Sequence, residues 1–303
     1  MLKAILLYLS RQKAIQGFMM NFGVTRRVVD RFVSGETLED GLNAVRKVNA
    51  EGATATLDHL GEEVSEPEEA IAATEVYLDA LDKINQNGVD TNVSVKPTQV
   101  GLKIDKKLCE ENFRRIIERA RKYGNFVRMD MEGSDCTQDT LDVFYSLRKK
   151  YDNVGIVIQT YLYRSEKDVD DIQKLGGRIR ICKGAYKEPK EIAFPKRQQV
   201  DDNFIKLMEK MLKSGIYHGI ATHDENIIEK TKEFAQRNNI SKETFEFQLL
   251  YGIRTELQHQ LVKDGYNVRI YIPFGRQWYP YFMRRLAERP ANLYFFLKNF
   301  FRA

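Results

Sequence analysis

Two groups of basic residues have the types and spacing needed to bind a small carboxylate. Arg284 and Arg285 are adjacent and lie among aromatic residues, and a second group pairs Arg180 with Lys183. A guanidinium presents a planar fork of N–H donors that matches both oxygens of a carboxylate. The alternative is an exposed basic helix face, on which Glu288 pairs with Arg284 at i+4 and contributes only a few tenths of a kcal/mol. Taken alone, the adjacent arginines favour that alternative.

Eight short apolar or β-branched runs, separated by longer charged stretches, could supply the elements that position these residues. Strand-like runs alternating with helical spacing are typical of βα units around a parallel sheet. The predicted strands are Ala53–Leu60, Thr91–Lys96, Phe126–Met131, Gly155–Thr160, Arg178–Lys183, Gly219–Thr222, Phe245–Leu250 and Val268–Pro273.

The stretch between the second and third runs shows the helical pattern most clearly. Phe113, Ile116, Ile117 and Ala120 form one apolar stripe at i, i+3, i+4 and i+7, and Gly124 is placed to end the helix. Eight such units over about 250 residues match a (β/α)8 barrel. A doubly wound sheet is less favoured, because the chain contains no glycine-rich nucleotide-binding turn or P-loop.

The first part of the chain is predicted to be mostly helical. We expect an N-terminal helical cap over residues 1–52 and the barrel over residues 53–303. No Pro/Gly/Ser-rich linker or internal repeat marks a separate domain.

Polar residues recur near the carboxyl ends of the predicted strands, where active sites of such barrels lie. Any one of them is explained as a solvated strand end, but their recurrence favours a site. They are Asp58, Glu62, Lys96, Asp130, Gln159, Arg180, Lys183, Thr222, His223 and Tyr271.

Composition excludes several classes of protein. The chain has 303 residues, is 43% hydrophobic and has a formal net charge of +5 from 48 basic and 43 acidic residues. These charges are spread without the concentrated basic run of a nucleic-acid binder. Three cysteines without a CxxC pair indicate neither a disulfide framework nor a structural zinc site, and four histidines without an HExxH motif make a metal improbable.

The distribution of apolar residues predicts a cytoplasmic protein. The apolar start Ala4–Leu9 is short, is followed by Arg11 and Lys13, and lacks a cleavage site for secretion. No apolar run approaches the roughly 20 residues that span a bilayer, so membrane contact would be peripheral.

Six motifs in a fixed order give the chain a resemblance to the proline dehydrogenase family, from about Leu57 to Glu288. Arg-x-x-Lys-Gly-Ala-Tyr followed by Arg-Arg-x-x-Glu is a specific combination. The motifs are Ser94-Val-Lys96, Arg128-Met-Asp130-Met-Glu132, Ile158-Gln159-Thr-Tyr-Leu162, Arg180-Ile-Cys-Lys-Gly-Ala-Tyr186, Ala221-Thr-His223 and Arg284-Arg285-Leu-Ala-Glu288.

The resemblance implies a distorted (β/α)8 barrel with non-covalent FAD and a last helix over the barrel mouth. It assigns Lys96, Arg284 and Arg285 to the proline carboxylate, and Asp130 and Glu288 to holding that cationic cluster in position. Its substrate wall comprises Ala185, Tyr186, Leu250 and Tyr271, and Glu62 is its gate beside the first arginine. The flavin-binding residues that it implies are Gln159, Arg180, Cys182, Lys183, Gly184, Thr222 and His223.

The implied reaction is hydride transfer from C5 of L-proline to flavin N5, giving Δ1-pyrroline-5-carboxylate. No side-chain nucleophile is required. Family members pass the electrons to a membrane quinone, so peripheral contact with the inner face of the membrane is possible through the aromatic segment Leu293–Phe301, although packing within the domain explains that segment better. Because the chain ends soon after Glu288, we expect a monofunctional form with a separate pyrroline-5-carboxylate dehydrogenase as partner.

Three other functions remain open from the residues alone. One is another flavin barrel, such as a methylenetetrahydrofolate reductase relative. Another is a Schiff-base aldolase that uses Lys96 or Lys183. The third is a basic scaffold that binds anionic membranes or nucleic acid. Flavin absorption separates the flavin enzymes from the other two, and bleaching by proline then identifies the dehydrogenase.

Overall fold

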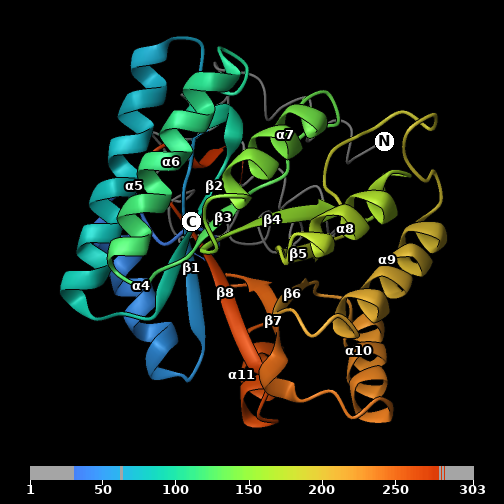
Figure 1. Cartoon of the computed structure of the whole chain (residues 1–303). Helices are drawn as coiled ribbons and strands as arrows, with labels where there is room; N and C mark the ends of the chain where they lie inside the picture. The colour runs from blue at the N-terminus through green and yellow to red at the C-terminus, as the bar shows by residue number, and fades with distance from the viewer. Residues whose placement is uncertain (1–30, 62–63, 280, 282, 284–303) are drawn as a thin grey trace, which may run out of the picture.

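The computed structural model describes residues 31–61, 64–279, 281 and 283. Its eight parallel strands close into a ring in chain order, from β1 next to β2 around to β8 next to β1. Figure 1 shows helices arranged around the outside of this ring. The predicted (β/α)8 barrel is therefore confirmed.

The strands begin and end within two residues of every predicted boundary. They are β1 (Thr54–His59), β2 (Thr91–Val95), β3 (Val127–Met129), β4 (Val154–Gln159), β5 (Arg178–Cys182), β6 (His218–Ala221), β7 (Phe245–Leu250) and β8 (Asn267–Phe274). The described helices are α4 (Leu38–Ala50), α5 (Pro67–Asn87), η1 (Pro97–Val100), α6 (Lys106–Lys122), α7 (Thr137–Arg148), α8 (Ser165–Lys174), α9 (Arg197–Leu212), α10 (Glu225–Arg237), η2 (Lys242–Thr244) and α11 (Thr255–Lys263).

Local sequence explains where α6 begins and ends. The Asp105 carboxylate caps the first turn by accepting from the backbone N–H groups of Lys107 and Leu108, at 2.6 and 3.1 Å. The four residues of its predicted apolar stripe are all fully buried. Gly124 follows the last turn with φ of +63°, a left-handed conformation that suits glycine.

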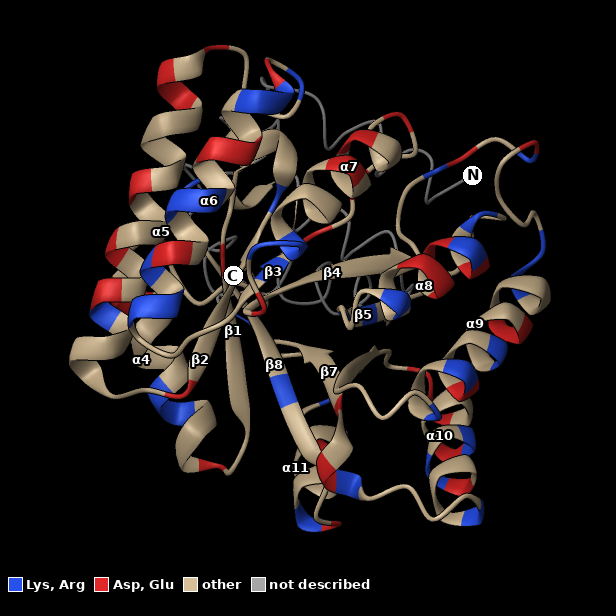
Figure 2. Ribbon diagram, in the orientation of Figure 1, with Lys and Arg blue, Asp and Glu red and all other residues tan. Residues whose placement is uncertain are grey.

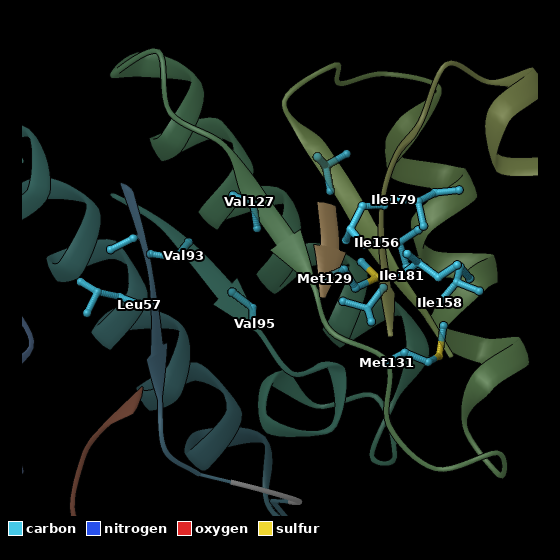
Figure 3. Packing of buried hydrophobic residues seen from close by; sticks show 14 of the residues in the cluster. Leu57, Val93, Val95, Val127, Met129, Met131, Ile156, Ile158, Ile179 and Ile181 are labelled. Carbon is cyan, nitrogen blue, oxygen red and sulfur yellow. The ribbon is translucent and has the colours of Figure 1, made fainter. Parts of the chain in front are cut away.

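The core lies between the strands and the helices. Alternate strand residues point outward and pack there, as Figure 3 shows for Val127 and Met129 of β3 and for Ile156 and Ile158 of β4. The intervening residues therefore point into the barrel. In most barrels this interior is filled by branched apolar side chains, but here many of them are polar.

Helix α4 packs on the barrel rather than standing apart from it. A Cβ added at Gly41 would lie 3.1 Å from the Leu57 side chain and 3.3 Å from the Phe274 ring, so the helix approaches β1 and β8 closely. Thr37 and Asp40 form a capping box at its start. The predicted boundary near residue 52 stays a prediction, and residues 1–30 of the predicted cap lie outside the described part of the chain.

Candidate active site

A buried ion pair lies at the carboxyl ends of β1 and β2. Lys96 Nζ is 2.6 Å from Asp58 Oδ1, and the two residues are only 9% and 0% exposed. Burial alone would lower the pKa of Lys96, but the charges of Asp58 and Asp130 raise it above its usual range. Lys96 is therefore cationic, and Asp58 partly neutralises it.

Asp130 connects three further side chains that point into the barrel from different strands. Its Oδ1 accepts from Arg180 Nη1 at 2.9 Å and from Ser94 Oγ at 2.6 Å, and its Oδ2 accepts from Tyr271 Oη at 2.9 Å. The Arg180 guanidinium also lies 5.2 Å from the Tyr271 ring centre, within cation–π range. One carboxylate thus fixes a cation and a phenol at the barrel mouth.

Arg180 is held on its other side by Gln248 of β7. Its Nε donates to Gln248 Oε1, and the arginine is only 5% exposed. Nη2 is buried and finds no acceptor among the described residues. Because a buried donor without a partner is costly, this group is available to a ligand.

Gln159, at the end of β4, leaves an acceptor available in the same way. Its amide nitrogen donates to the carbonyl oxygens of Met131 and Glu132, at 3.0 and 2.8 Å, which fixes the amide orientation. Its Oε1 is buried and has no donor among the residues that the structure describes. The β4–β5 ladder places Gln159 beside Cys182.

The loop after β5 brings the next predicted residues to this end of the barrel. Lys183 Nζ forms ion pairs with Asp224 at 2.8 Å and Asp201 at 2.5 Å. Burial raises the pKa of the Cys182 thiol to about 12, so this side chain is not a thiolate nucleophile. Gly184 has φ of +108° and lies against the ring of Tyr161, where an added Cβ would be only 2.5 Å away.

The predicted residues after β6 and β7 lie close together. Thr222 Oγ1 accepts from the backbone N–H of Asp224, and His223 Nε2 accepts from the backbone N–H of Leu250 at 3.3 Å. The bond from Leu250 to His223 joins the ends of two neighbouring strands, whereas the bond to Thr222 is local to the loop after β6. By contrast, Ala185 and Tyr186 are exposed, Tyr186 by 39%.

Four predicted site residues lie outside the described part of the chain. They are Glu62, Arg284, Arg285 and Glu288. The predicted placement of the arginine pair over the barrel mouth therefore stays a prediction.

Three residues of the site have no role predicted from the sequence. Asp58 is predicted only as a polar strand end, Ser94 belongs only to a motif, and Gln248 is not among the predicted site residues. The two-residue period of a strand could have found two of them, because residues two positions apart point to the same side. Ser94 is two positions before Lys96, and Gln248 is two positions before Leu250.

Together, the fold and this geometry define a (β/α)8 barrel with a buried cationic site at its carboxyl end. The proline dehydrogenase family model matches residues 41–298. The chain is 42% identical to proline dehydrogenase 2 of Bacillus subtilis over 293 residues, which covers 97% of this chain and 96% of that one. It is 40% identical to the proline dehydrogenase of Deinococcus radiodurans over 277 residues, covering 90% and 89%.

A solved structure of proline utilization A from Bdellovibrio bacteriovorus, inactivated by N-propargylglycine, has the same fold with a TM-score of 0.82 and 26% identity. The match covers 87% of this chain and 33% of that one, so this chain spans about a third of that protein. The chain belongs to the proline dehydrogenase family, and the resemblance seen in its motifs is confirmed.

Proposed function

We propose that this protein oxidises L-proline to Δ1-pyrroline-5-carboxylate with FAD as the hydride acceptor, the first step of proline catabolism. When bound, FAD supplies through N5 the two-electron redox chemistry that no side chain has. The observation that carries the proposal is the Lys96–Asp58 and Arg180–Asp130 arrangement at the carboxyl end of a barrel of this family.

The residues at the ends of β4 and β5 fit a flavin. A flavin ring displays an N–H donor and several acceptors along one edge, so it needs both kinds of partner. Gln159 leaves a buried oxygen and Arg180 leaves a buried N–H group, each without a described partner. Gln159, Arg180, Cys182, Lys183, Gly184, Thr222 and His223 are the residues that would hold FAD.

Lys96 would bind the substrate carboxylate together with Arg284 and Arg285. Since Asp58 is only 2.6 Å from Lys96, the cation is already compensated before a substrate carboxylate arrives. Asp130 and Glu288 would keep the cationic groups in position. Glu62 would act as a gate beside the first arginine.

Tyr271, Tyr186, Leu250 and Ala185 would surround the pyrrolidine ring. The Tyr271 hydroxyl is fixed by Asp130, which holds the ring in one orientation. An apolar wall excludes water from the C–H bond that breaks, and orientation is the main contribution of these side chains. The amine of proline must be neutral for C5 to release hydride.

The electrons would pass to a quinone, and a separate pyrroline-5-carboxylate dehydrogenase would consume the product. No described helix is long and apolar enough to cross a membrane. For residues 293–301, packing within the domain is favoured over peripheral contact with the inner face of the membrane, and those residues lie outside the described ranges.

Product analysis tests the proposal. Purified protein supplied with FAD, L-proline and an artificial electron acceptor should form Δ1-pyrroline-5-carboxylate, identified by mass spectrometry. A folate substrate consumed instead of proline would favour a relative of methylenetetrahydrofolate reductase.

A further inference from the structure

A cavity of about 250 Å³ opens at the amino-terminal ends of the strands, opposite the candidate active site. We call it the N-terminal pocket. Its lining includes two aromatic residues, three arginines and one buried acid: Phe126, Tyr217, Arg128, Arg178, Arg269 and Glu246. Figure 2 marks in blue the basic residues of β5 and β8, the strands that carry two of the three arginines.

One of these arginines is already neutralised. The Arg269 Nε lies 2.9 and 3.0 Å from the two oxygens of Glu246, and Glu246 also accepts from Tyr217 Oη at 3.1 Å. Glu246 is only 2% exposed. Its oxygens are therefore occupied.

The other two arginines have no such partner. No carboxylate of the described chain lies within 4 Å of the guanidinium of Arg128 or Arg178. Asp90 is a second acid of the pocket and, like Arg178, is exposed at the rim. The three arginines of the pocket therefore outnumber its two acids.

Arg128 is the buried member of the pair, with only 3% exposure. Its Nη1 donates to the carbonyl oxygens of Ile156 at 3.3 Å and Arg178 at 2.8 Å. Its Nε is buried without an acceptor among the residues described. Burial and the charge of Arg180 lower the pKa of Arg128 from its usual range, and the charge of Glu246 offsets this shift only in part.

Both guanidiniums are held in place by an aromatic ring. Their central carbons lie 5.0 and 5.1 Å from the Phe126 ring centre, and that of Arg178 also lies 5.7 Å from Tyr217. Stacking leaves the N–H edges of a guanidinium available. Gly155 permits this arrangement, because a Cβ there would be only 2.6 Å from Arg128 Nη1.

We propose that the N-terminal pocket binds a phosphate-type oxyanion between Arg128 and Arg178. Guanidiniums pair with phosphate oxygens through parallel N–H···O bonds, and a dianion matches two cations that lack carboxylate partners. The pocket opens to solvent at the end of the barrel away from Lys96, so the anion enters without passing the active site.

Calorimetric titration of the FAD-loaded protein with inorganic phosphate, at constant ionic strength with chloride as the balancing anion, tests the proposal. We expect saturable binding to one site. Arg178→Gln should weaken it at least tenfold, and the Arg is exposed, so the variant should fold. Arg121→Gln is the matched control, because Arg121 is exposed on α6 outside the pocket and its loss changes net charge equally.

Absence of saturable binding to the wild-type protein would overturn the proposal, as would equal affinities of the Arg178→Gln and Arg121→Gln variants. Acetate binding as tightly as phosphate would contradict the choice of a dianion. A phosphate monoester titrated in parallel identifies the source of the group: tighter binding of the monoester indicates a phosphorylated metabolite, and tighter binding of inorganic phosphate indicates the free ion.

Discussion

At the scale of residues, the candidate active site consists of cations that each have a carboxylate close by. Asp58 compensates Lys96, and Asp130 compensates Arg180. Without those partners, burial would favour loss of the proton from the lysine and would leave the arginine as an isolated charge. The pairing therefore compensates both cations in the site that we propose for a carboxylate substrate.

Replacing the lysine tests its role in binding. Lys96→Met should raise the KM for proline roughly ten- to hundredfold, because a hydrogen bond to a charged group contributes about 1.5–3 kcal/mol. Steady-state kinetics at saturating acceptor measures this change. Lys103→Met is the control, since Lys103 is exposed and pairs with Asp135 at 3.0 Å. Equal KM values for the two variants would remove Lys96 from the substrate site.

Arg180 offers a second test at this scale. Arg180→Lys keeps the charge but cannot reach Gln248, Ser94 and Asp130 at once, as the guanidinium does. We expect lower flavin content and a shifted flavin absorption spectrum in the purified protein. A variant with unchanged flavin content and an unchanged spectrum would place Arg180 outside the cofactor site.

At the scale of elements, the sequence predicted the strands well because the apolar runs coincide with the buried ladder. The residue pairs that make the site could not be predicted in this way, because their members are far apart in the sequence. Asp58 and Lys96 are 38 positions apart, and Arg180 and Gln248 are 68 apart. Periodicity shows which way a side chain points along one strand, but it does not give the stagger between strands, so these partners could not be predicted.

The bounds of β3 were predicted less well than those of the other strands. The predicted run Phe126–Met131 is longer than the observed strand Val127–Met129. Asp130 still donates its backbone N–H to the Val95 carbonyl oxygen at 2.9 Å, but the regular ladder has ended. Apolar residues indicate which part of the chain is buried. Here the buried part extends beyond the hydrogen-bonded strand, so the predicted strand is too long.

The loop after β5 depends on one glycine. Gly184→Ala should lower flavin content, because φ of +108° is unfavourable for alanine and the new Cβ would meet the Tyr161 ring. The purified variant's ratio of flavin to protein absorbance measures this. Gly215→Ala is a useful comparison, since its φ is +72° and an added Cβ there meets nothing within 4 Å. A larger flavin loss in Gly215→Ala than in Gly184→Ala would contradict the role given to this loop.

At the scale of the whole molecule, a chain of hydrogen bonds runs through the polar barrel interior. It begins at the N-terminal pocket and ends at the candidate active site, in the order Arg269, Glu246, Gln248, Arg180, Asp130 and Tyr271. The network satisfies most of the buried polar groups along this path, and the ones that it leaves unpaired, Arg180 Nη2 and Arg128 Nε, lie at its two ends.

Acid stability depends on a histidine at the amino-terminal end of β6. His218 is fully buried and its Nδ1 accepts from the Ile179 backbone N–H at 3.0 Å. Burial and the charge of Arg128 lower its pKa to about 3. The unfolded chain binds a proton below about pH 6.5, whereas the folded protein does not until about pH 3. Stability should therefore fall with pH across that range.

At pH 5 this single group should cost about 2 kcal/mol relative to pH 8. His218→Asn, whose oxygen can also accept from Ile179, should lose less stability between these pH values than the wild-type protein. Urea unfolding at both pH values measures the difference. Equal losses in the two proteins would show that His218 does not titrate as described.

The central claim is that proline reduces a flavin held at the carboxyl end of this barrel. Anaerobic addition of L-proline to the FAD-loaded protein, followed by flavin absorbance, tests it most directly. We predict bleaching of the oxidised flavin bands that saturates with L-proline and does not occur with D-proline. A protein that binds no flavin, or whose flavin stays oxidised at saturating L-proline, would contradict the claim.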